Sequence, residues 1–219
     1  AFAKFPINPE PLPMSAMPNH AIRVHAFGGP EKMVWEPLAV GDPGPGQVRI
    51  RHTAVGVNFV DVIVRRGLHG AAVPPVVIGR EGAGVVLAVG PGVTRLRVGD
   101  RVGYAPVQGS YCHERLIDAD VLVKVPDAID DRSVAAIMLQ GMTVQYLIRQ
   151  IHRVQPGDTI LMHAAAGGVG LFLCQWAAAL GARVIGTVSS DEKAALARAH
   201  GCHDTIIYTR EDFVSRVHQ

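Results

Sequence analysis

The first half of the chain alternates short apolar runs with glycine and proline turns. From residue 21 to about residue 129, runs such as QVRIRHTAVGV, GAGVVLAVG and VLVKVP have the length and valine content of β-strands. Stretches such as GDPGPG and GPGV mark turns between them, and one short helix is expected at Phe59–Arg66, ended by Gly67. The pattern predicts a small Greek-key or barrel-like β body. On the pattern alone, a β domain without a functional site explains it equally well.

The period of the apolar positions changes near residue 132. Residues 133–150 repeat them as a helix does, and three strand–helix units follow. The expected strands are Thr159–His163, Arg183–Val188 and Thr205–Tyr208, and the expected helices cover Gly168–Leu180, Asp191–His200 and a segment that starts near Glu211. Ser189 and Glu192 have the spacing of a capping box before the second of these helices. Strands that alternate with helices imply a parallel sheet.

Composition and charge exclude several classes of protein. The 219 residues allow one or two domains, and 48% hydrophobic residues rule out a disordered chain. A formal net charge of +2 gives no support for nucleic-acid binding, and no uninterrupted apolar stretch reaches the roughly 18 residues of a membrane span. The three cysteines, Cys112, Cys174 and Cys202, form no CxxC pair or disulfide framework, so we expect a reducing, cytoplasmic location.

Residues 1–20 read differently from the rest. They contain five prolines and begin with Ala rather than Met. We expect a disordered or non-native extension there, with Met14 or Met17 as a possible natural start.

The turn after the first expected strand of the second half carries the clearest candidate chemistry. The fingerprint for a dinucleotide pyrophosphate is G-x-G-x-x-G between a strand and a helix. In HAAAGGVG, the three fingerprint positions are Ala165, Gly167 and Gly170, with Gly168 and Val169 between the last two. The middle glycine lets the backbone approach the pyrophosphate, and the helix N-terminus presents N–H groups to it. A tight turn without a ligand is the simpler alternative.

The end of the next expected strand indicates which dinucleotide is bound. NAD enzymes usually place an acidic residue there, which holds the ribose 2′-hydroxyl. Here the strand ends in Ser189 and Ser190, and Lys193 follows. Hydroxyls and a cation suit a 2′-phosphate, so the sequence favours NADPH. Asp191 and Glu192 oppose this interpretation, although acidic residues are also favourable in the first turn of a helix.

These motifs resemble one family. HAAAGGVGLFLCQWAAALGA and GTVSSDEKAALARAHG, together with VGVNFVDVIVRRGL and GREGAGVVLAVGPGVTRLRVGDRVGYA, resemble the quinone oxidoreductase (zeta-crystallin-like) branch of the medium-chain dehydrogenase/reductase superfamily. The resemblance implies an α/β chain: a GroES-like, β-rich catalytic domain over residues 21–130, then a Rossmann-type parallel sheet over residues 131–219. It implies an enzyme in which NADPH reduces a quinone, and a homodimer at full length.

The resemblance also implies roles for single residues. Asn58 and Thr143 would be catalytic and lie near the nicotinamide, whereas Lys193 and Tyr208 would contact the adenosine end of the cofactor. Zinc-dependent relatives have Cys at the position of Asn58 and His at that of Arg80, so no metal site is expected. Asp61 and Glu81 are then expected to make local hydrogen bonds. Three further departures from the family, Ile63, His69 and Gln140, leave the substrate preference open.

Two alternatives and a question of length remain. An NADPH-dependent enone or alkenal reductase on the same scaffold, or a non-catalytic nucleotide-binding (crystallin-like or RNA-binding) relative, would share these motifs. Only three strands are expected from Thr159 to the end, whereas a full doubly wound fold has six. We therefore expect the Rossmann sheet to be truncated, as a fragment or a truncated product, with reduced stability and activity. His163 and Cys174 are expected to be structural.

Overall fold

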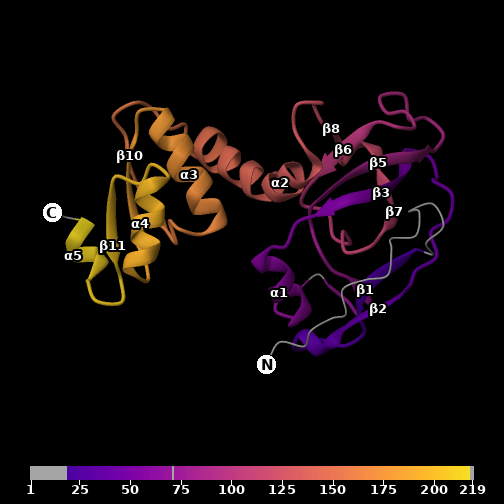
Figure 1. The fold of residues 1–219 in the computed structure, drawn as a ribbon, viewed down its shortest axis with the longest axis horizontal. Coiled ribbons are helices and arrows are strands. Elements are labelled where there is room, and N and C mark those ends of the chain that lie inside the picture. Colours follow the sequence, from indigo (N-terminus) through magenta and orange to yellow (C-terminus); the bar gives the residue numbers. More distant parts are fainter. Residues whose placement is uncertain (1–18, 71, 218–219) are drawn as a thin grey trace. The chain divides into compact units, whose positions relative to one another are not determined.

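The computed structural model describes residues 19–70 and 72–217 and divides into two compact units, Ala1–Ala135 and Ala136–Gln219 (Figure 1). Each unit has its own buried apolar cluster. The units are described separately below.

The first unit is built from two antiparallel sheets. The larger has the strand order β7-β3-β5-β6-β8 and the smaller has the order β2-β1-β4. Strand bounds in the larger sheet are β3 Gln47–Val55, β5 Gly82–Val89, β6 Arg101–Tyr104, β7 Glu114–Asp118 and β8 Val123–Lys124; in the smaller sheet they are β1 His20–Val24, β2 Met33–Pro37 and β4 Val76–Val77.

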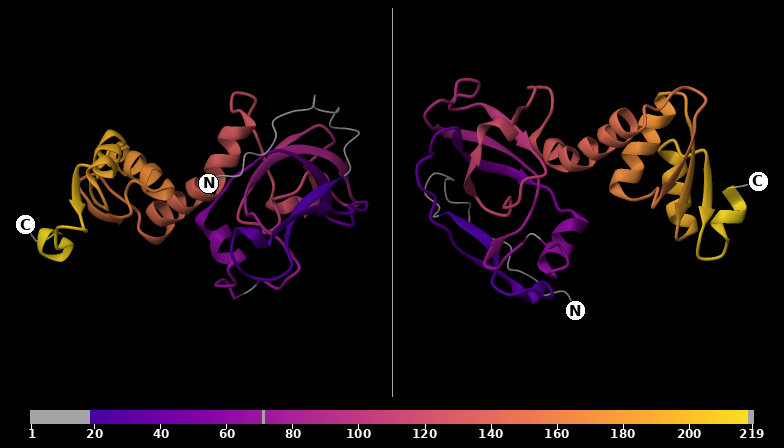
Figure 2. Two further views of the ribbon diagram at one scale, coloured as in Figure 1. Left: turned by 60° about the horizontal axis from the view of Figure 1, so that its bottom comes forward. Right: turned by 180° about the vertical axis from the view of Figure 1, so that it is seen from behind.

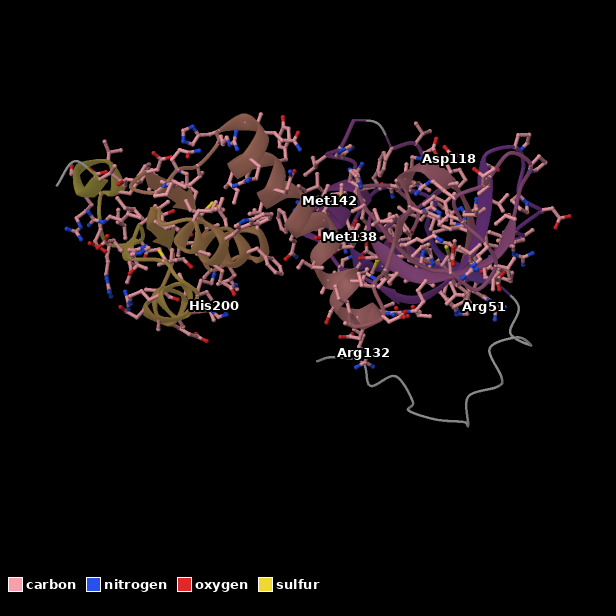
Figure 3. The ribbon with its side chains drawn as sticks, turned by 90° about the horizontal axis from the view of Figure 1, so that it is seen from above. Arg51, Asp118, Arg132, Met138, Met142 and His200 are labelled. Carbon is pink, nitrogen blue, oxygen red and sulfur yellow. The ribbon has the colours of Figure 1, made fainter. Side chains whose placement is uncertain are left out.

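Strand β3 shows why the first unit folds as a β body. Its side chains alternate between the two faces of the sheet, and Val48 and Ile50 are completely buried. On the other face, Arg49 and Arg51 both pair with Glu114 of the neighbouring strand, at nitrogen–oxygen distances of 2.6 and 2.7 Å. Figure 3 labels Arg51. The alternation places the apolar side chains in the core and the ion pairs on the outer face.

Short helical segments complete the part of the first unit that the structure describes. They are α1 (Phe59–Arg65) and the 3-10 turns η2 (Pro30–Lys32) and η3 (Ala119–Val121). Helix α1 ends one residue earlier than its sequence predicts, and Gly67, with φ +74°, follows.

A helix leads from the first unit into the second. Helix α2 (Asp131–Gln145) is followed by the π-helical turn η4 (Tyr146–Ile151). The expected helical segment over residues 133–150 is therefore confirmed, and its last part is a π-helical turn. Apolar spacing alone does not distinguish a π turn from a regular one.

The second unit is a parallel sheet with helices, as its pattern predicts. Its strands have the order β11-β10-β9, and the element bounds are β9 Thr159–His163, α3 Gly168–Ala179, β10 Arg183–Val188, α4 Asp191–Ala199, β11 Asp204–Ile207 and α5 Phe213–Val217. Helices α3 and α4 contact each other and pack on the strands (Figure 2). Ile160, Val184 and Val188 pack in the core with these helices.

Several boundaries differ from the sequence expectations by one or two residues; α3 and α4, for example, each end one residue earlier. Strand β11 begins and ends one residue earlier, so Tyr208 lies just beyond it, and α5 begins at Phe213 rather than near Glu211. The capping box of Ser189 and Glu192 is wrong. Because α4 begins at Asp191, its N-cap is Ser190, whose Oγ accepts a hydrogen bond from the Lys193 backbone N–H at 3.3 Å.

The three cysteines are free and buried, which confirms the burial expected for Cys174. In the part of the chain that the structure describes, no helix has the length and apolar character needed to cross a membrane.

Candidate cofactor site

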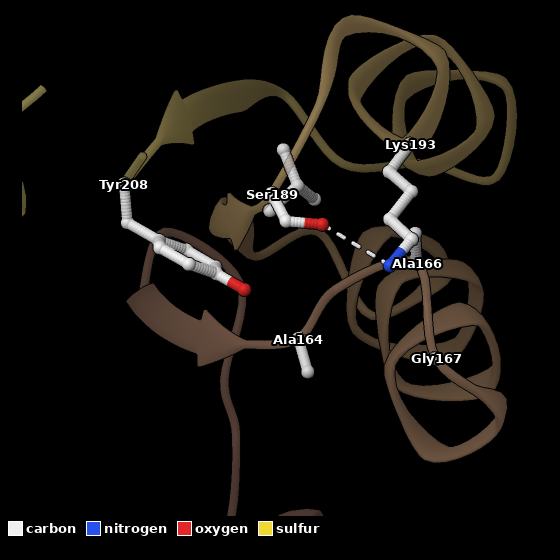
Figure 4. A pocket seen from close by; sticks show the side chains of 7 residues that line it. Ala164, Ala166, Gly167, Ser189, Lys193 and Tyr208 are labelled. Carbon is white, nitrogen blue, oxygen red and sulfur yellow. Dashed lines mark hydrogen bonds between the residues drawn. The ribbon is translucent and has the colours of Figure 1, made fainter. Parts of the chain in front are cut away.

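A pocket of about 130 Å³ opens where the carboxyl ends of β9, β10 and β11 meet (Figure 4). Parallel α/β sheets bind ligands at this edge. The pocket is lined by Ala164, Ala166, Gly167, Val188, Ser189, Lys193 and Tyr208. The structure thus brings together four of the residues expected to bind a cofactor: Gly167, Ser189, Lys193 and Tyr208.

The glycine turn forms one wall of this pocket and is held tightly. Ala164 has φ +54°, which is unusual for a residue other than glycine. The Gly167 N–H donates to the Ala164 carbonyl at 2.8 Å, and the Ala165 N–H donates to the carbonyl of Thr187 on β10 at 3.1 Å. These bonds fix the turn against the strand and direct the first turn of α3 toward the strand ends.

Two glycines are required by close packing at this turn. A Cβ on Gly170 would lie 2.6 Å from the Ala165 carbonyl oxygen, and a Cβ on Gly186 would lie 2.5 Å from the Ala165 Cβ. Gly170 therefore lets α3 pack closely on the turn, which is the role of the last fingerprint glycine. Ala165 replaces the first fingerprint glycine and is fully buried between these elements.

Lys193 and Ser189 form the polar side of the pocket. The Lys193 ammonium group donates to Ser189 Oγ at 3.1 Å, and Lys193 itself is exposed (Figure 4). An exposed ammonium and a hydroxyl are both able to donate to a phosphate oxygen. Ser190 does not line the pocket, because its hydroxyl caps α4. Its contact with a cofactor stays a prediction, as do those of Ala165, Gly168, Val169 and Gly170.

Tyr208 lies opposite Lys193 in Figure 4 and is 52% exposed. Its backbone N–H donates to the Val188 carbonyl at 3.1 Å, and the next residue, Thr209, donates from Oγ1 to the Ser189 carbonyl at 3.1 Å. The two loops that follow β10 and β11 are therefore bound to each other at the rim of the pocket.

In the first unit, Asn58 lies in a buried polar cluster. It is 8% exposed and precedes α1, and its Nδ2 donates to Glu81 Oε1 at 2.6 Å. Its backbone N–H donates to Asp61 Oδ2 at 2.9 Å, and the Tyr111 hydroxyl donates to the same oxygen at 3.0 Å. Burial raises the pKa of Asp61. Both carboxyl groups make local hydrogen bonds, as expected.

Arg80 and His69 lie close together in the first unit. Arg80 Nη1 is 3.2 Å from His69 Nε2, and Arg80 Nε is buried without a hydrogen-bond partner. Within residues 19–70 and 72–217, no group of three or more His, Cys, Asp or Glu side chains is arranged to hold a metal ion.

Thr143 lies in the second unit, on α2, where its Oγ1 donates to the Leu139 carbonyl at 2.7 Å. Asn58 belongs to the first unit. Their joint role at a nicotinamide therefore stays a prediction.

His163 and Cys174, the two residues expected to have structural roles, both contact neighbouring protein groups. His163 Nδ1 is 3.0 Å from Thr187 Oγ1, and its ring meets the Phe213 ring edge-on at a centroid distance of 5.2 Å. Cys174 is completely buried in the core of the second unit.

Sequence reasoning missed two features of this site. The Gln140 side chain covers the glycine turn, so that a Cβ on Gly168 would lie 2.5 Å from its Oε1. Asp191 pairs with Arg210 through both carboxylate oxygens, at 2.8 and 2.5 Å. Asp191 and Arg210 are 19 positions apart, so no local signal in the sequence indicates that they pair.

Comparison with known protein families shows to which family the chain belongs. The model of the alcohol dehydrogenase GroES-like domain matches residues 44–154, just over half of the chain. The chain belongs to this family. A second model, described as zinc-binding dehydrogenase, matches residues 168–219. The resemblance to the quinone oxidoreductase branch of the medium-chain dehydrogenase/reductase superfamily is confirmed.

Individual relatives agree with this assignment. The chain is 53% identical over 202 residues to a 2-haloacrylate reductase from a Burkholderia species and 52% identical over 198 residues to a quinone oxidoreductase from Pseudomonas aeruginosa. These alignments cover 90% of this chain and 61% of each relative. The crystal structure of Escherichia coli quinone oxidoreductase complexed with NADPH is similar, with 41% identity and a TM-score of 0.87, over 90% of this chain and 61% of that one. The chain therefore spans about three fifths of the length of these relatives.

Proposed function

We propose that the protein is an NADPH-dependent reductase of quinones that needs no zinc. The observation that carries the proposal is the pocket at the strand ends, where the glycine turn meets Lys193, Ser189 and Tyr208. The related Escherichia coli quinone oxidoreductase, whose structure contains NADPH, supports the choice of cofactor.

The residues of the pocket fit the adenosine end of NADPH. The Lys193 ammonium and the Ser189 hydroxyl offer donors that match a 2′-phosphate. Tyr208 offers an exposed ring edge and hydroxyl beside them. Gly167 keeps side-chain atoms away from the first turn of α3, so a pyrophosphate can approach the backbone N–H groups there.

When bound, NADPH supplies a hydride, and the protein orients the cofactor and the acceptor. We assign the orientation of the nicotinamide and the acceptor carbonyl to Asn58 and Thr143. The Asn58 amide is held by Glu81 and does not titrate, so it would keep its orientation at all pH values of interest. The Thr143 hydroxyl donates to its own helix, which leaves its oxygen to accept a hydrogen bond.

Independence of zinc rests on the residue types of the first unit. Asn58 and Arg80 occupy positions at which zinc-dependent members of the resembled superfamily have zinc ligands. A catalytic zinc normally needs three protein ligands. An amide and a guanidinium are poor substitutes, because Arg carries no lone pair for a metal. The same proposal includes domain boundaries near residues 20 and 130, a homodimer of the full-length protein and a cytoplasmic location.

A steady-state assay tests the proposal. Purified protein, dialysed against a chelator and checked by metal analysis, is assayed for oxidation of NADPH and of NADH with and without a soluble benzoquinone. We expect quinone-dependent oxidation that prefers NADPH and survives the chelator. Loss of activity when the chelator removes a bound zinc would contradict the proposal. An equal rate of oxidation of NADH and NADPH would also contradict it. Nucleotide binding with no oxidation would favour the non-catalytic alternative.

A second candidate function is the reduction of an electron-poor alkene. The 2-haloacrylate reductase at 53% identity favours it, and the first unit offers a cation, Arg80, beside its buried polar cluster. The same assay with 2-chloroacrylate in place of the quinone distinguishes the two. A higher kcat/KM for the acrylate would make the alkene the preferred class of substrate.

A further inference from the structure

An acidic residue stands next to the proposed 2′-phosphate site. Asp191 follows Ser189 and Ser190 directly and begins α4, two residues before Lys193. Its carboxylate is paired with the Arg210 guanidinium through two parallel hydrogen bonds, Nη1 to Oδ2 at 2.8 Å and Nη2 to Oδ1 at 2.5 Å. Both side chains are largely exposed, at 75% for Asp191 and 58% for Arg210.

Without its partner, this carboxylate would oppose NADPH. An acidic residue near the end of this strand is the feature by which related folds hold the ribose 2′-hydroxyl of NAD, and its charge repels a 2′-phosphate. Asp191 is charged at neutral pH, and the Arg210 guanidinium, which lowers the pKa of this carboxyl, offsets its negative charge beside the pocket. The geometry of the pair is the bidentate one in which Arg binds a carboxylate best.

The backbone holds Arg210 in place for this pairing. The loop after β11 is tied to the loop after β10 at three successive residues: Tyr208 N–H to the Val188 carbonyl, Thr209 Oγ1 to the Ser189 carbonyl, and Arg210 to Asp191. The loop that brings Tyr208 to the pocket therefore also brings Arg210 to Asp191. Arg210 and Asp191 are not lining residues, so the pair flanks the pocket instead of filling it.

We propose that Arg210 determines the cofactor specificity of this protein by neutralising Asp191 beside the 2′-phosphate site. The inference rests on the proposed function, because it concerns the same pocket and the same cofactor. Arg210 acts through Asp191 and is a positioning residue. It makes the site selective for a 2′-phosphorylated nucleotide although an acidic residue follows the strand.

Binding of two adenosine nucleotides to the whole chain tests this inference. Adenosine 2′,5′-bisphosphate and adenosine 5′-phosphate differ only in the 2′-phosphate, so the ratio of their dissociation constants, measured by calorimetry, reports on that group alone. For a separation on the order of 8 Å and an effective dielectric of about 40, one unbalanced unit charge changes binding by roughly fivefold. We expect Arg210→Ala to weaken the bisphosphate about fivefold and the monophosphate less than twofold.

A double-mutant cycle separates loss of the charge balance from loss of structure. Asp191→Asn/Arg210→Ala should return bisphosphate affinity to within about twofold of the unaltered protein, because neither charge remains. Asp191→Asn alone, which leaves Arg210 unpaired, should bind the bisphosphate at least as tightly as the unaltered protein. In 1 M NaCl, where the Debye length is about 3 Å, the effect of Arg210→Ala should fall below twofold.

The Arg183–Asp204 pair provides a matched control. It is an exposed ion pair of 2.8 Å at the opposite ends of the same strands, β10 and β11. Arg183→Ala should leave both affinities unchanged. If Arg210→Ala keeps the selectivity of the unaltered protein, or if the double variant stays as weak as Arg210→Ala, the inference is wrong while the proposed function stands. If the unaltered protein does not distinguish the two nucleotides, the NADPH preference in the proposed function is itself wrong.

Discussion

The Asn58 cluster of the first unit and the Lys193 pocket of the second hold their polar groups in opposite ways. Asn58, Asp61 and Glu81 are at most 8% exposed and bond to protein groups around them. Lys193 and Tyr208 are exposed to solvent, and the Lys193 ammonium donates to Ser189 Oγ. Buried polar groups are costly to leave without partners, whereas exposed ones are held by water. Substitutions in the first cluster should therefore change stability, and substitutions in the second should change binding.

The largest expected difference between the units is their response to acid. Burial lowers the pKa of His52, in the first unit, to about 4. The neutral ring donates from Nδ1 to the Cys112 carbonyl at 2.8 Å and accepts at Nε2 from the Tyr104 hydroxyl at 2.7 Å. Because the unfolded chain binds this proton near pH 6.5, stability is present above that pH and is lost as the pH falls toward 4. The loss approaches about 3 kcal/mol.

Each unit has one tryptophan, so the response to acid can be measured unit by unit. Trp35 lies in the first unit and Trp176 in the second. Urea unfolding of a Trp176→Phe variant, followed by Trp35 fluorescence from pH 7 to pH 4.5, should show this loss. His52→Gln, which keeps a donor and an acceptor without titrating, should be less stable at pH 7 but should have a flatter pH dependence. An unchanged pH dependence in that variant would remove His52 as the cause.

The glycine turn should be the most sensitive part of the second unit. A Cβ on Gly170 would meet the backbone carbonyls of Ala164 and Ala165, which cannot move cheaply, so Gly170→Ala should lower the free energy of unfolding by about 2 to 3 kcal/mol. A Cβ on Gly168 would meet only the flexible end of Gln140, so Gly168→Ala should cost less than about 1 kcal/mol. Trp176 fluorescence during urea unfolding, in a Trp35→Phe background, measures the cost of both substitutions. Equal costs would show that the packing at Gly170 is not as close as described.

A pair of alanine substitutions compares the two regions directly. Asn58→Ala removes a donor from the buried Glu81 carboxyl and should lower the free energy of unfolding of the first unit by about 2 kcal/mol. Lys193→Ala changes an exposed side chain and should change the free energy of unfolding of the second unit by less than about 0.5 kcal/mol. The contrast fails if Lys193→Ala destabilises its unit as much as Asn58→Ala destabilises the other.

Much of the second unit could be predicted from the sequence because its signals are local. The parallel sheet, the strands β9 and β10 and the fingerprint turn follow from apolar period and glycine spacing, which backbone geometry fixes directly. The predicted cap of α4 lies one residue too early, because Ser189 and Ser190 have the same chemistry. Only the start of the helix decides which of the two hydroxyls caps it.

Other features depend on contacts between distant parts of the chain. The Asp191–Arg210 pair joins residues 19 positions apart, and the Asn58–Glu81 bond joins residues 23 apart. No local pattern marks either pair, because each forms only when neighbouring strands or loops come together. The strand order of the β-rich unit likewise depends on long-range pairing, such as β3 with β7.

Titration of the protein with NADPH and NADH, with and without Lys193→Ala, tests the central claim most directly. The claim is that the pocket at the ends of β10 and β11 recognises a 2′-phosphate through Lys193. A charge-assisted hydrogen bond contributes enough for roughly a tenfold change in affinity. We predict that Lys193→Ala weakens NADPH about tenfold and NADH less than twofold. Equal losses for the two dinucleotides, or no preference in the unaltered protein, would contradict the account.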